Sequence, residues 1–359
     1  MVVVLAILPG RLQPLDYMVV CIYEDRPQQF VGVKLLLLSL LRHCSDWRLR
    51  LYAPNLVSEQ VQWLLRHPSV DVVEARLSGA GSYNVKPAVL LDSLDRGDEK
   101  CLWLDTDILV NGSLKFLVDE SPDVVIVSQD PWEYPEGSSF RCSAWGLEEG
   151  RSLPGPLNTA VVRITRQHRR LIESWRQLLD NPAYRVEQRK PVRERNGLLL
   201  SDQDGLSALL ASSEYANIRV RRLGHAGEVL QHHGAGAYGL RERRQHRRSG
   251  LPPLVHAMGT VKPWLRKRRV SPFTSPRDYY ESLYLELSPY MHLAGNYQSE
   301  LDEDVGWLRE RTFASVVSEW ISGHDPVRAG TFQATLHRLL SRSIPRWKDL
   351  DVRSEQGDG

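Results

Sequence analysis

The chain has 359 residues, of which 42% are hydrophobic and 25% charged, and its formal net charge is +2 at pH 7. Such a composition is ordinary for a globular enzyme, and the length allows one large domain with an appendage or two domains. The small net charge argues against a chain that binds nucleic acid over its whole surface. Four widely spaced cysteines, without a CxxC or zinc-type pattern, favour buried free thiols over a disulfide framework.

The apolar runs are too short for a membrane span, which takes about 20 residues. Val2–Leu8 lacks a basic stretch before it, so it is a weak candidate for a signal peptide. Lys34–His43 is more apolar, and its length suits a buried helix. We therefore expect a soluble, cytoplasmic protein in which residues 1–16 are an irregular lead-in.

Apolar strand-like runs alternate with helical patterns along the first half of the chain. Pro27 is placed to open the first helix and Ser58 to cap the second. Strands are expected at Tyr17–Tyr23, Arg48–Pro54, Val70–Ala75, in a run that ends at Asp105, and at Asp123–Ser128 and Leu157–Thr165, with helices after Pro27, over Ser58–Arg66 and Pro87–Leu94, and around Leu171–Leu179. The alternation predicts an α/β fold with a mainly parallel sheet and helices on both faces.

The remaining segments are expected to be less regular. Trp132–Pro156 is rich in Gly, Ser and Pro and reads as a loop, whereas the pattern after about Ser271 is helical and amphipathic. The expected organisation is a lead-in over residues 1–16, a main domain over 17–270, a helical region over 271–350 and a polar tail over 351–359.

Ligands of open α/β sheets bind at the carboxyl ends of the strands. No GxGxxG follows the first strand and no GxxxxGK[ST] occurs in the chain. The sequence therefore offers no support for a dinucleotide site of the Rossmann type or for a P-loop.

Asp105, Thr106 and Asp107 form a D-x-D at such a strand end. Two carboxylates beside an apolar strand are costly to desolvate, and a divalent cation would offset that cost while leaving positions for phosphate oxygens. The alternative is a strand-end turn in which the aspartates cap backbone N–H groups.

Two further segments favour the metal site. Lys86 begins the helix before the aspartate strand, and His256, Gly259 and Lys262 follow far downstream. Imidazole suits manganese, a glycine lets the backbone approach a phosphate, and a lysine supplies a positive charge.

The order of the segments NVKPAVLL, LWLDTDILV, LNTAVV, SDQDGLS and HAMGTVKPW resembles the retaining glycosyltransferases of the glycogenin and lipopolysaccharide galactosyltransferase family, family 8, over roughly Tyr17 to Trp264. The resemblance implies a GT-A fold, a mixed and mainly parallel sheet with helices on both faces, followed here by the C-terminal helical appendage. It also implies an Mn²⁺ or Mg²⁺ ion and a nucleotide-sugar donor, with a UDP-sugar expected.

The same resemblance implies roles for individual residues. Asp105, Asp107 and His256 would bind the metal, and Gly259 and Lys262 would hold the donor diphosphate. Lys86 and Asp202 would contact the donor sugar, with Asp105 and Thr106 also beside the donor. The remaining implied positions are Gln203 beneath the anomeric carbon, Asn158 facing the reacting sugar and acceptor, and Tyr23, Glu24 and Asp25 near the nucleotide base.

Two departures from the family pattern weaken any transfer of sugar specificity. Thr159 and Ala160 follow the asparagine where the family has small residues and glycine, and Ala257 and Met258 follow the histidine where an aromatic residue is common. The resemblance implies retention at the anomeric carbon. Because an amide is a poor nucleophile, same-face attack by the acceptor is preferred over a covalent intermediate on Asp202.

Two other functions stay open at this stage. A nucleotidyltransferase shares the sheet and the metal carboxylates, but it would need a glycine-rich loop where Tyr23–Phe30 has none. The other is a non-catalytic glycan-binding scaffold. For the transferase we expect a hydroxyl acceptor, such as a lipid-linked or surface glycan or a natural product, and no nucleic acid.

Basic residues are concentrated around the proposed site, in Leu240–Gly250 and Trp264–Val270. One interpretation is a mobile, solvated loop. The other is peripheral contact of the 240–270 region with an anionic membrane, at its inner face, or with a phosphorylated acceptor.

Overall fold

A computed structural model of the chain describes residues 17–131, 137–191, 194–231, 238–259, 262–265, 273 and 276–343. The expected lead-in, the polar tail and most of the second basic run, residues 266–270, lie outside these residues.

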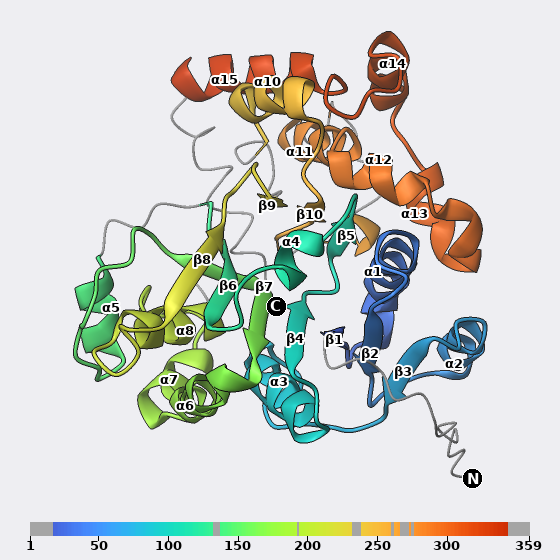
Figure 1. Cartoon of the computed structure of the whole chain (residues 1–359). Coiled ribbons are helices and arrows are strands. Elements are labelled where there is room, and N and C mark those ends of the chain that lie inside the picture. The colour runs from blue at the N-terminus through green and yellow to red at the C-terminus, as the bar shows by residue number, and fades with distance from the viewer. Residues whose placement is uncertain are drawn as a thin grey trace.

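A seven-stranded sheet in the order β3-β2-β1-β4-β7-β6-β8 forms the centre of the molecule (Figure 1). Neighbouring strands are parallel except for β7, which runs antiparallel to both β4 and β6. The predicted α/β fold with a mixed, mainly parallel sheet is therefore confirmed. The strands are β1 (Met18–Tyr23), β2 (Arg48–Tyr52), β3 (Val70–Val73), β4 (Lys100–Leu104), β6 (Val124–Gln129), β7 (Leu157–Thr165) and β8 (Arg219–Leu223).

One face of this sheet is covered by helices that share a hydrophobic cluster with it. Val89, Trp175 and Leu206 are buried in this cluster, one from each of the three main helices. These elements are α3 (Lys86–Asp95), α6 (Arg169–Leu179) and α8 (Asp202–Ala211), with α5 (Ser138–Ala144) and α7 (Pro182–Gln188) beside them.

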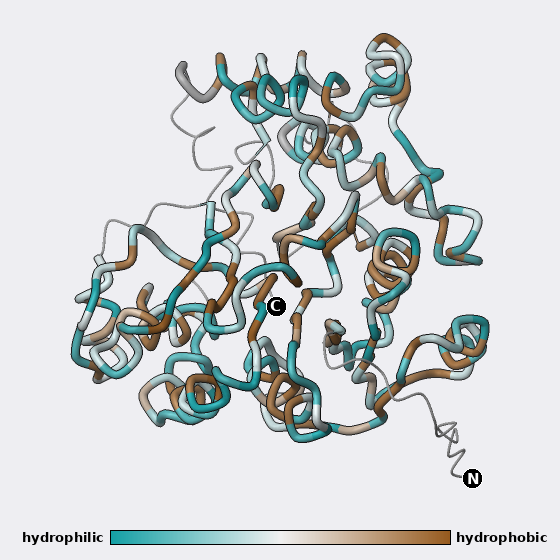
Figure 2. Tube along the Cα trace, in the orientation of Figure 1, coloured by the Kyte–Doolittle hydropathy of each residue, from teal (hydrophilic) through white to brown (hydrophobic). Residues whose placement is uncertain are grey.

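The other face carries α1 (Phe30–His43) and α2 (Ser58–Leu65), which bury an almost continuous apolar run against the strands. The short helix α4 (Lys115–Val118) packs on the same face of the sheet. Hydrophobic residues are concentrated in the central strands and in α1 (Figure 2). Helices therefore cover both faces, as predicted.

A second sheet, which the sequence analysis did not anticipate, has the order β5-β10-β9. Its strands are β5 (Ile108–Val110), β9 (Val229–Gln231) and β10 (Leu254–His256). β10 runs antiparallel to β5 with His256 opposite Ile108. This register places His256 next to Asp107, although the two residues lie far apart in the sequence.

Three local expectations were wrong. The expected loop at 132–156 contains helix α5, whose side chains pack against α8. The basic run at 240–250 is not a solvated loop but helix α10 (Leu240–Ser249), because arginine is a good helix former and the Glu242 carboxylate accepts the Gly239 N–H at 2.9 Å. The N-cap of α2 is Val57 rather than Ser58, and its N–H is satisfied by the side chain of Gln60.

From Pro276 onward the regular elements that the structure describes are all helical. Tyr290 and Met291 join the same hydrophobic cluster as α1, so this helical region shares a core with the sheet. Its helices are α11 (Pro276–Glu286), α12 (Pro289–Gly295), α13 (Gly306–Arg309), α14 (Phe313–Ile321) and α15 (Thr331–Ser343).

All four cysteines are buried and free, as predicted. Among the described residues, every helix is too short or too polar to cross a membrane.

Candidate active site

The D-x-D forms the turn between β4 and β5. The Asp105 N–H donates to the Ala160 carbonyl of β7, and the Ile108 N–H donates to the Asp105 carbonyl, so the chain makes a tight turn after the strand. Through this turn the two carboxylates lie at the carboxyl end of β4. This is where open α/β sheets bind ligands.

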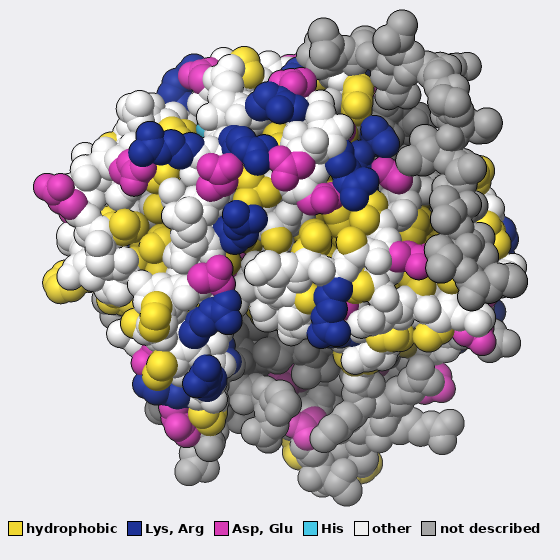
Figure 3. All heavy atoms as spheres, turned by 90° about the horizontal axis from the view of Figure 1, so that it is seen from below, with side chains coloured by type: hydrophobic (Ala, Val, Ile, Leu, Met, Phe, Trp, Pro, Cys, Tyr) yellow, Lys and Arg dark blue, Asp and Glu magenta, His cyan; other side chains and the backbone are white. Residues whose placement is uncertain are grey.

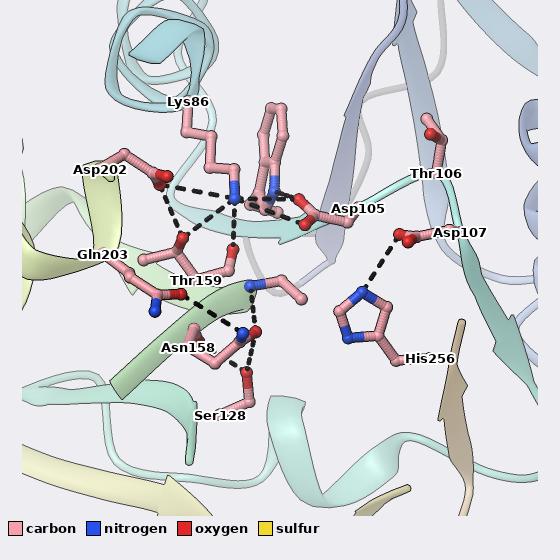
Figure 4. A network of polar contacts seen from close by, with 12 residues as sticks. Lys86, Asp105, Thr106, Asp107, Ser128, Asn158, Thr159, Asp202, Gln203 and His256 are labelled. Atoms are coloured by element: carbon pink, nitrogen blue, oxygen red, sulfur yellow. Dashed lines mark hydrogen bonds and ion pairs between the residues drawn. The ribbon is translucent and has the colours of Figure 1, made fainter. Parts of the chain in front are cut away.

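Asp105, Asp107 and His256 converge at this turn (Figure 4). Each offers a ligand atom, and these atoms lie within 4.8 Å of one another. The Nε2 atom of His256 lies 3.2 Å from Asp107 Oδ1, while Nδ1 faces the amide oxygen of Gln231 on β9. An imidazole oriented through its second nitrogen is typical of metal ligands, and two carboxylates with one imidazole suit Mn²⁺ or Mg²⁺. The residues present therefore fit a divalent cation.

Lys262 supplies a positive charge at the same place. Its ammonium group donates to Asp107 Oδ2. Burial alone raises the pKa of the Asp107 carboxyl, but Lys262 and His256 outweigh it and hold that pKa well below its usual range. Asp107 is therefore an ionised carboxylate although only 4% of it is exposed.

A second buried network lies on the other side of Asp105 (Figure 4). The ammonium group of Lys86 is 3.1 Å from Asp105, 3.0 Å from the Thr159 hydroxyl and 3.5 Å from Asp202. The Thr159 hydroxyl in turn donates to Asp202 at 2.6 Å. Burial lowers the pKa of Lys86, but Asp105 and Asp202 outweigh it and raise that pKa above its ordinary value. Burial raises the pKa of Asp202, against the opposing effect of Lys86.

Gln203 and Asn158 lie beside this network. The Gln203 amide nitrogen donates to Asp130 at 3.0 Å, and its oxygen accepts from the Asn158 side chain at 3.4 Å. The pairing of β6 with β7 shifts register between Val127 and Ser128, opposite Asn158. Such irregularities re-aim side chains at strand ends, and here the Ser128 hydroxyl donates to the Asn158 carbonyl at 2.6 Å.

The residues expected near a nucleotide base form a group at the end of β1. The Tyr23 hydroxyl donates to Asp25 at 3.1 Å, and Asp25 accepts the Gly81 N–H at 2.6 Å. Glu24 is buried and accepts from the Thr106 hydroxyl at 3.2 Å. Thr106 therefore points toward Glu24 and away from the Asp105–His256 cluster (Figure 4).

Gly259 has a φ of +135°, a conformation that favours glycine, and it stands three residues before Lys262. A cavity of about 320 Å³ lies between the loop at 78–84 and helices α6 and α7. It contains none of the residues of the Asp105–His256 cluster, so the site is defined by its side chains and not by this cavity.

Several residues around the site were missed by the sequence analysis. The Trp103 indole N–H donates to Asp105 at 2.7 Å, and Thr159, seen only as a departure from a pattern, bridges Lys86 and Asp202. Asp130 follows a strand just as Asp105 does, so the strand-end rule pointed to it equally. For Trp103 and Thr159 the sequence carries no signal, because their roles depend on partners distant in the chain.

The chain was compared with known proteins. No protein-family model matches it, and no curated protein is similar to it in sequence. The solved structures that resemble it include glycosyltransferases. The similarity to the bifunctional glycosyltransferase WbbM has a TM-score of 0.48 at 12% identity and covers 82% of this chain and 53% of WbbM.

The glycosyltransferase GlyE of Streptococcus pneumoniae TIGR4 matches with a TM-score of 0.44 at 17% identity, over 79% of this chain and 64% of GlyE. The galactosyltransferase LgtC, solved with donor and acceptor sugar analogs, matches with a TM-score of 0.46 at 18% identity, over 79% of this chain and 99% of LgtC. Resemblances at this level assign neither a family nor an activity. The chemistry of the site has to carry the functional argument.

Proposed function

We propose that this protein is a metal-dependent, retaining glycosyltransferase that moves a sugar from a nucleotide sugar, in our proposal a UDP-sugar, to a hydroxyl acceptor. The observation that carries the proposal is the convergence of Asp105, Asp107 and His256 within 4.8 Å at a strand end. Two lysines flank this cluster, on Asp107 and on Asp105. Carboxylates for a cation beside an ammonium group for phosphate, here that of Lys262, are what a sugar diphosphate leaving group requires.

When bound by Asp105, Asp107 and His256, Mn²⁺ or Mg²⁺ would stabilise the negative charge of the departing diphosphate. Lys262 would move from Asp107 to the same phosphates, and Gly259 would let the backbone approach them. Loss of one such contact costs about 3–4 kcal/mol in the transition state. The leaving group would thus be held by two segments, 105–107 and 256–262, that lie about 150 positions apart in the sequence.

Lys86 and Asp202 would orient the donor sugar from their buried network, and Asn158 would face the reacting sugar and the acceptor. The Gln203 amide, held by Asp130 and Asn158, would lie under the anomeric carbon. A positioned amide suits stabilisation of a positively charged sugar better than attack on it. Same-face attack by the acceptor is therefore the proposed route to retention.

The group at the end of β1, Tyr23, Glu24 and Asp25, would hold the nucleotide base, and Thr106, held by Glu24, would adjoin the donor. The proposed acceptor is a hydroxyl of a lipid-linked or surface glycan or of a natural product. The basic 240–270 region would contact an anionic membrane or a phosphorylated acceptor.

The test is hydrolysis of a panel of nucleotide sugars by the full chain without acceptor, with Mn²⁺, Mg²⁺ or a chelator. We expect slow release of a nucleoside diphosphate from one donor, lost with the chelator and reduced at least about 100-fold in Asp107→Asn. Asp46→Asn, the same change at an exposed surface residue, serves as the control and is expected to be unaffected. If no donor is cleaved under any metal condition, the transferase proposal is wrong.

A further inference from the structure

Helix α14 exposes apolar side chains and buries a polar one. Phe313, Val316 and Trp320, spaced three and four residues apart, share one face and are exposed, Phe313 to 84% and Trp320 to 75%. The residue that α14 buries is Ser315. A surface helix of a globular protein normally turns its apolar stripe inward.

Helix α15, the next regular element along the chain, repeats this arrangement. Phe332 and Leu339, two turns apart on one face, are exposed to 73% and 57%. Gln333, Ala334 and His337 are buried on the other side, where Ala334 packs in a cluster with two tyrosines of α11. Two successive helices therefore present apolar side chains to the surroundings, which in a soluble domain marks an interaction surface.

A strongly basic helix lies alongside this surface. Helix α10 packs against α15, and α10, α15 and α14 gather along the upper edge of the molecule in Figure 1. Five arginines and one glutamate give α10 a charge of +4, more than the +2 of the whole chain. Figure 2 shows α10 as hydrophilic beside hydrophobic patches on α14 and α15.

The charge of α10 is segregated rather than spread over the molecule. Arg241, Arg244, Arg247 and Arg248 are exposed. On the opposite side, basic and acidic side chains are interspersed (Figure 3). An anionic partner would therefore be attracted to the α10 side in particular.

We propose that the exposed faces of α14 and α15, together with α10, form a surface that docks on a lipid bilayer with anionic headgroups. Tryptophan and phenylalanine insert at the boundary between headgroups and acyl chains, and the arginines of α10 contact the phosphates. A second copy of the chain would bring the same positive charge against itself. This surface refines the membrane contact proposed above, and its biological role rests on the proposed function, because a transferase for a lipid-linked acceptor works at a membrane.

The experiment is co-sedimentation of the full chain with vesicles of phosphatidylcholine alone and of phosphatidylcholine mixed equally with phosphatidylglycerol. We expect salt-sensitive binding to the anionic vesicles, at least about tenfold weaker in the double variant Phe313→Ser, Trp320→Ser. The double variant Arg244→Gln, Arg248→Gln is expected to lose about fivefold per arginine. Phe140→Ser removes another exposed phenylalanine, from α5, and is expected to bind as the wild type does.

Donor hydrolysis without acceptor is measured on the same preparations and is expected to be unchanged, since none of these side chains belongs to the proposed donor site and the assay contains no acceptor. Absence of binding to anionic vesicles at low salt overturns the proposal, as does equal binding by the Phe313, Trp320 variant. A dimer in light scattering that this variant dissolves, without vesicle binding, would assign the face to a second copy instead. Vesicle binding without donor hydrolysis would contradict only the proposed transferase, and hydrolysis without vesicle binding would contradict only the docking surface.

Discussion

At the scale of single residues, the two carboxylates of the D-x-D, Asp107 buried and Asp105 half-buried, each have a counter-charge within reach. Lys86 lies on Asp105 and Lys262 on Asp107, so neither carboxylate is left as an isolated charge in the interior. Because these lysines are also the proposed donor contacts, binding of a cation and a diphosphate would exchange partners among charges already present. In the proposed transferase the charges that stabilise the leaving group would therefore be gathered before the donor binds, and Lys262 would change its partner.

Trp103 positions Asp105 through its indole N–H, 2.7 Å from the carboxylate. Trp103→Phe removes this donor and keeps most of the packing. Changes to a group that orients a metal ligand typically cost 10–100-fold, so we expect about that loss of apparent Mn²⁺ affinity in donor hydrolysis. The control is Trp63→Phe, which removes an indole donor to the Glu300 carbonyl, remote from the site. Equal Mn²⁺ affinity in wild type and Trp103→Phe would show that the indole only fills space.

Asp204 makes the stability of the protein depend on pH. Burial, opposed by Arg141, raises the pKa of its carboxyl to about 6, from 3.8. The folded state thus holds this proton more tightly than the unfolded state, and the stability that the proton supplies is lost as the pH rises through 6. Over pH 4 to 7 the wild type should lose roughly 2.5 kcal/mol relative to Asp204→Asn, which can still accept from the Ser201 N–H.

This difference can be followed by denaturant unfolding of the two proteins at several pH values. Asp46→Asn, at an exposed position, controls for the loss of a charge and is expected to track the wild type. Parallel curves for wild type and Asp204→Asn would mean that Asp204 is not buried as the structure has it.

Single residues of the site differ in how far the sequence predicts them. Asp107 and His256 stand out because a carboxylate at a strand end and a histidine before Gly259 and Lys262 carry chemistry in their own segments. Thr159 does not, since its hydroxyl matters only where β7 brings it between Lys86 and Asp202. The residue types in a sequence segment therefore indicate candidate catalytic and metal-binding side chains. The residues that position those side chains are known only from the three-dimensional structure.

At the scale of elements, helix α1 approaches the D-x-D turn because of one glycine. A Cβ on Gly32 would lie 2.7 Å from the Thr106 carbonyl oxygen and 2.8 Å from the Trp264 ring. The Thr106 carbonyl oxygen can move only together with the backbone, so Gly32→Ala has to displace either the helix or the turn. The Trp264 indole also donates to Gln29 at 2.8 Å, which ties the segment of Lys262 to the start of the same helix.

We expect Gly32→Ala to lower the free energy of unfolding by about 1–3 kcal/mol and to reduce donor hydrolysis, because the displaced turn carries Asp105 and Asp107. Denaturant unfolding and the hydrolysis assay measure the two effects. Gly295→Ala, in α12 where a Cβ would meet nothing within 4 Å, is the matched control. Wild-type behaviour of Gly32→Ala in both assays would contradict the close approach of α1.

Some strands are predicted by the residues of their own segment, and others depend on pairing with distant segments. The strands β1, β2 and β7 follow from apolar runs in their own residues, and each was predicted to within two residues. β5, β9 and β10 have three residues each, and β10 pairs with β9 across 25 positions but with β5 across more than 140. The sequence could not reveal that sheet, and with it the register that brings His256 to Asp107. The antiparallel direction of β7 was hidden for the same reason.

At the scale of the whole molecule, one buried arginine joins the basic helix to the C-terminal helices. Arg243 on α10 is 2% exposed, its guanidinium lies 4.4 Å from the centre of the Tyr238 ring, and it donates to the carbonyls of Val327 (2.9 Å) and Ala329. Both carbonyls belong to the connection between α14 and α15. The orientation of the two helices with outward apolar faces is therefore fixed, in part, through this side chain.

Arg243→Met keeps an unbranched apolar stem but leaves the two carbonyls without their charged donor. Hydrogen bonds to a charged group contribute about 1.5–3 kcal/mol each, so we expect a loss of roughly 3 kcal/mol in the local stability of residues 322–343. Hydrogen exchange resolves this local change, with faster exchange expected in α15 and unchanged exchange in β1 and β4. Arg244→Met, the exposed neighbour on the same helix, is the control and should leave the exchange of α15 at wild-type rates. Because the proposed active site lies at the sheet, the Arg243→Met variant should keep its donor hydrolysis and lose vesicle binding. The opposite result, loss of hydrolysis with unchanged hydrogen exchange in α15, would show that α10 acts on the site and not on the C-terminal helices.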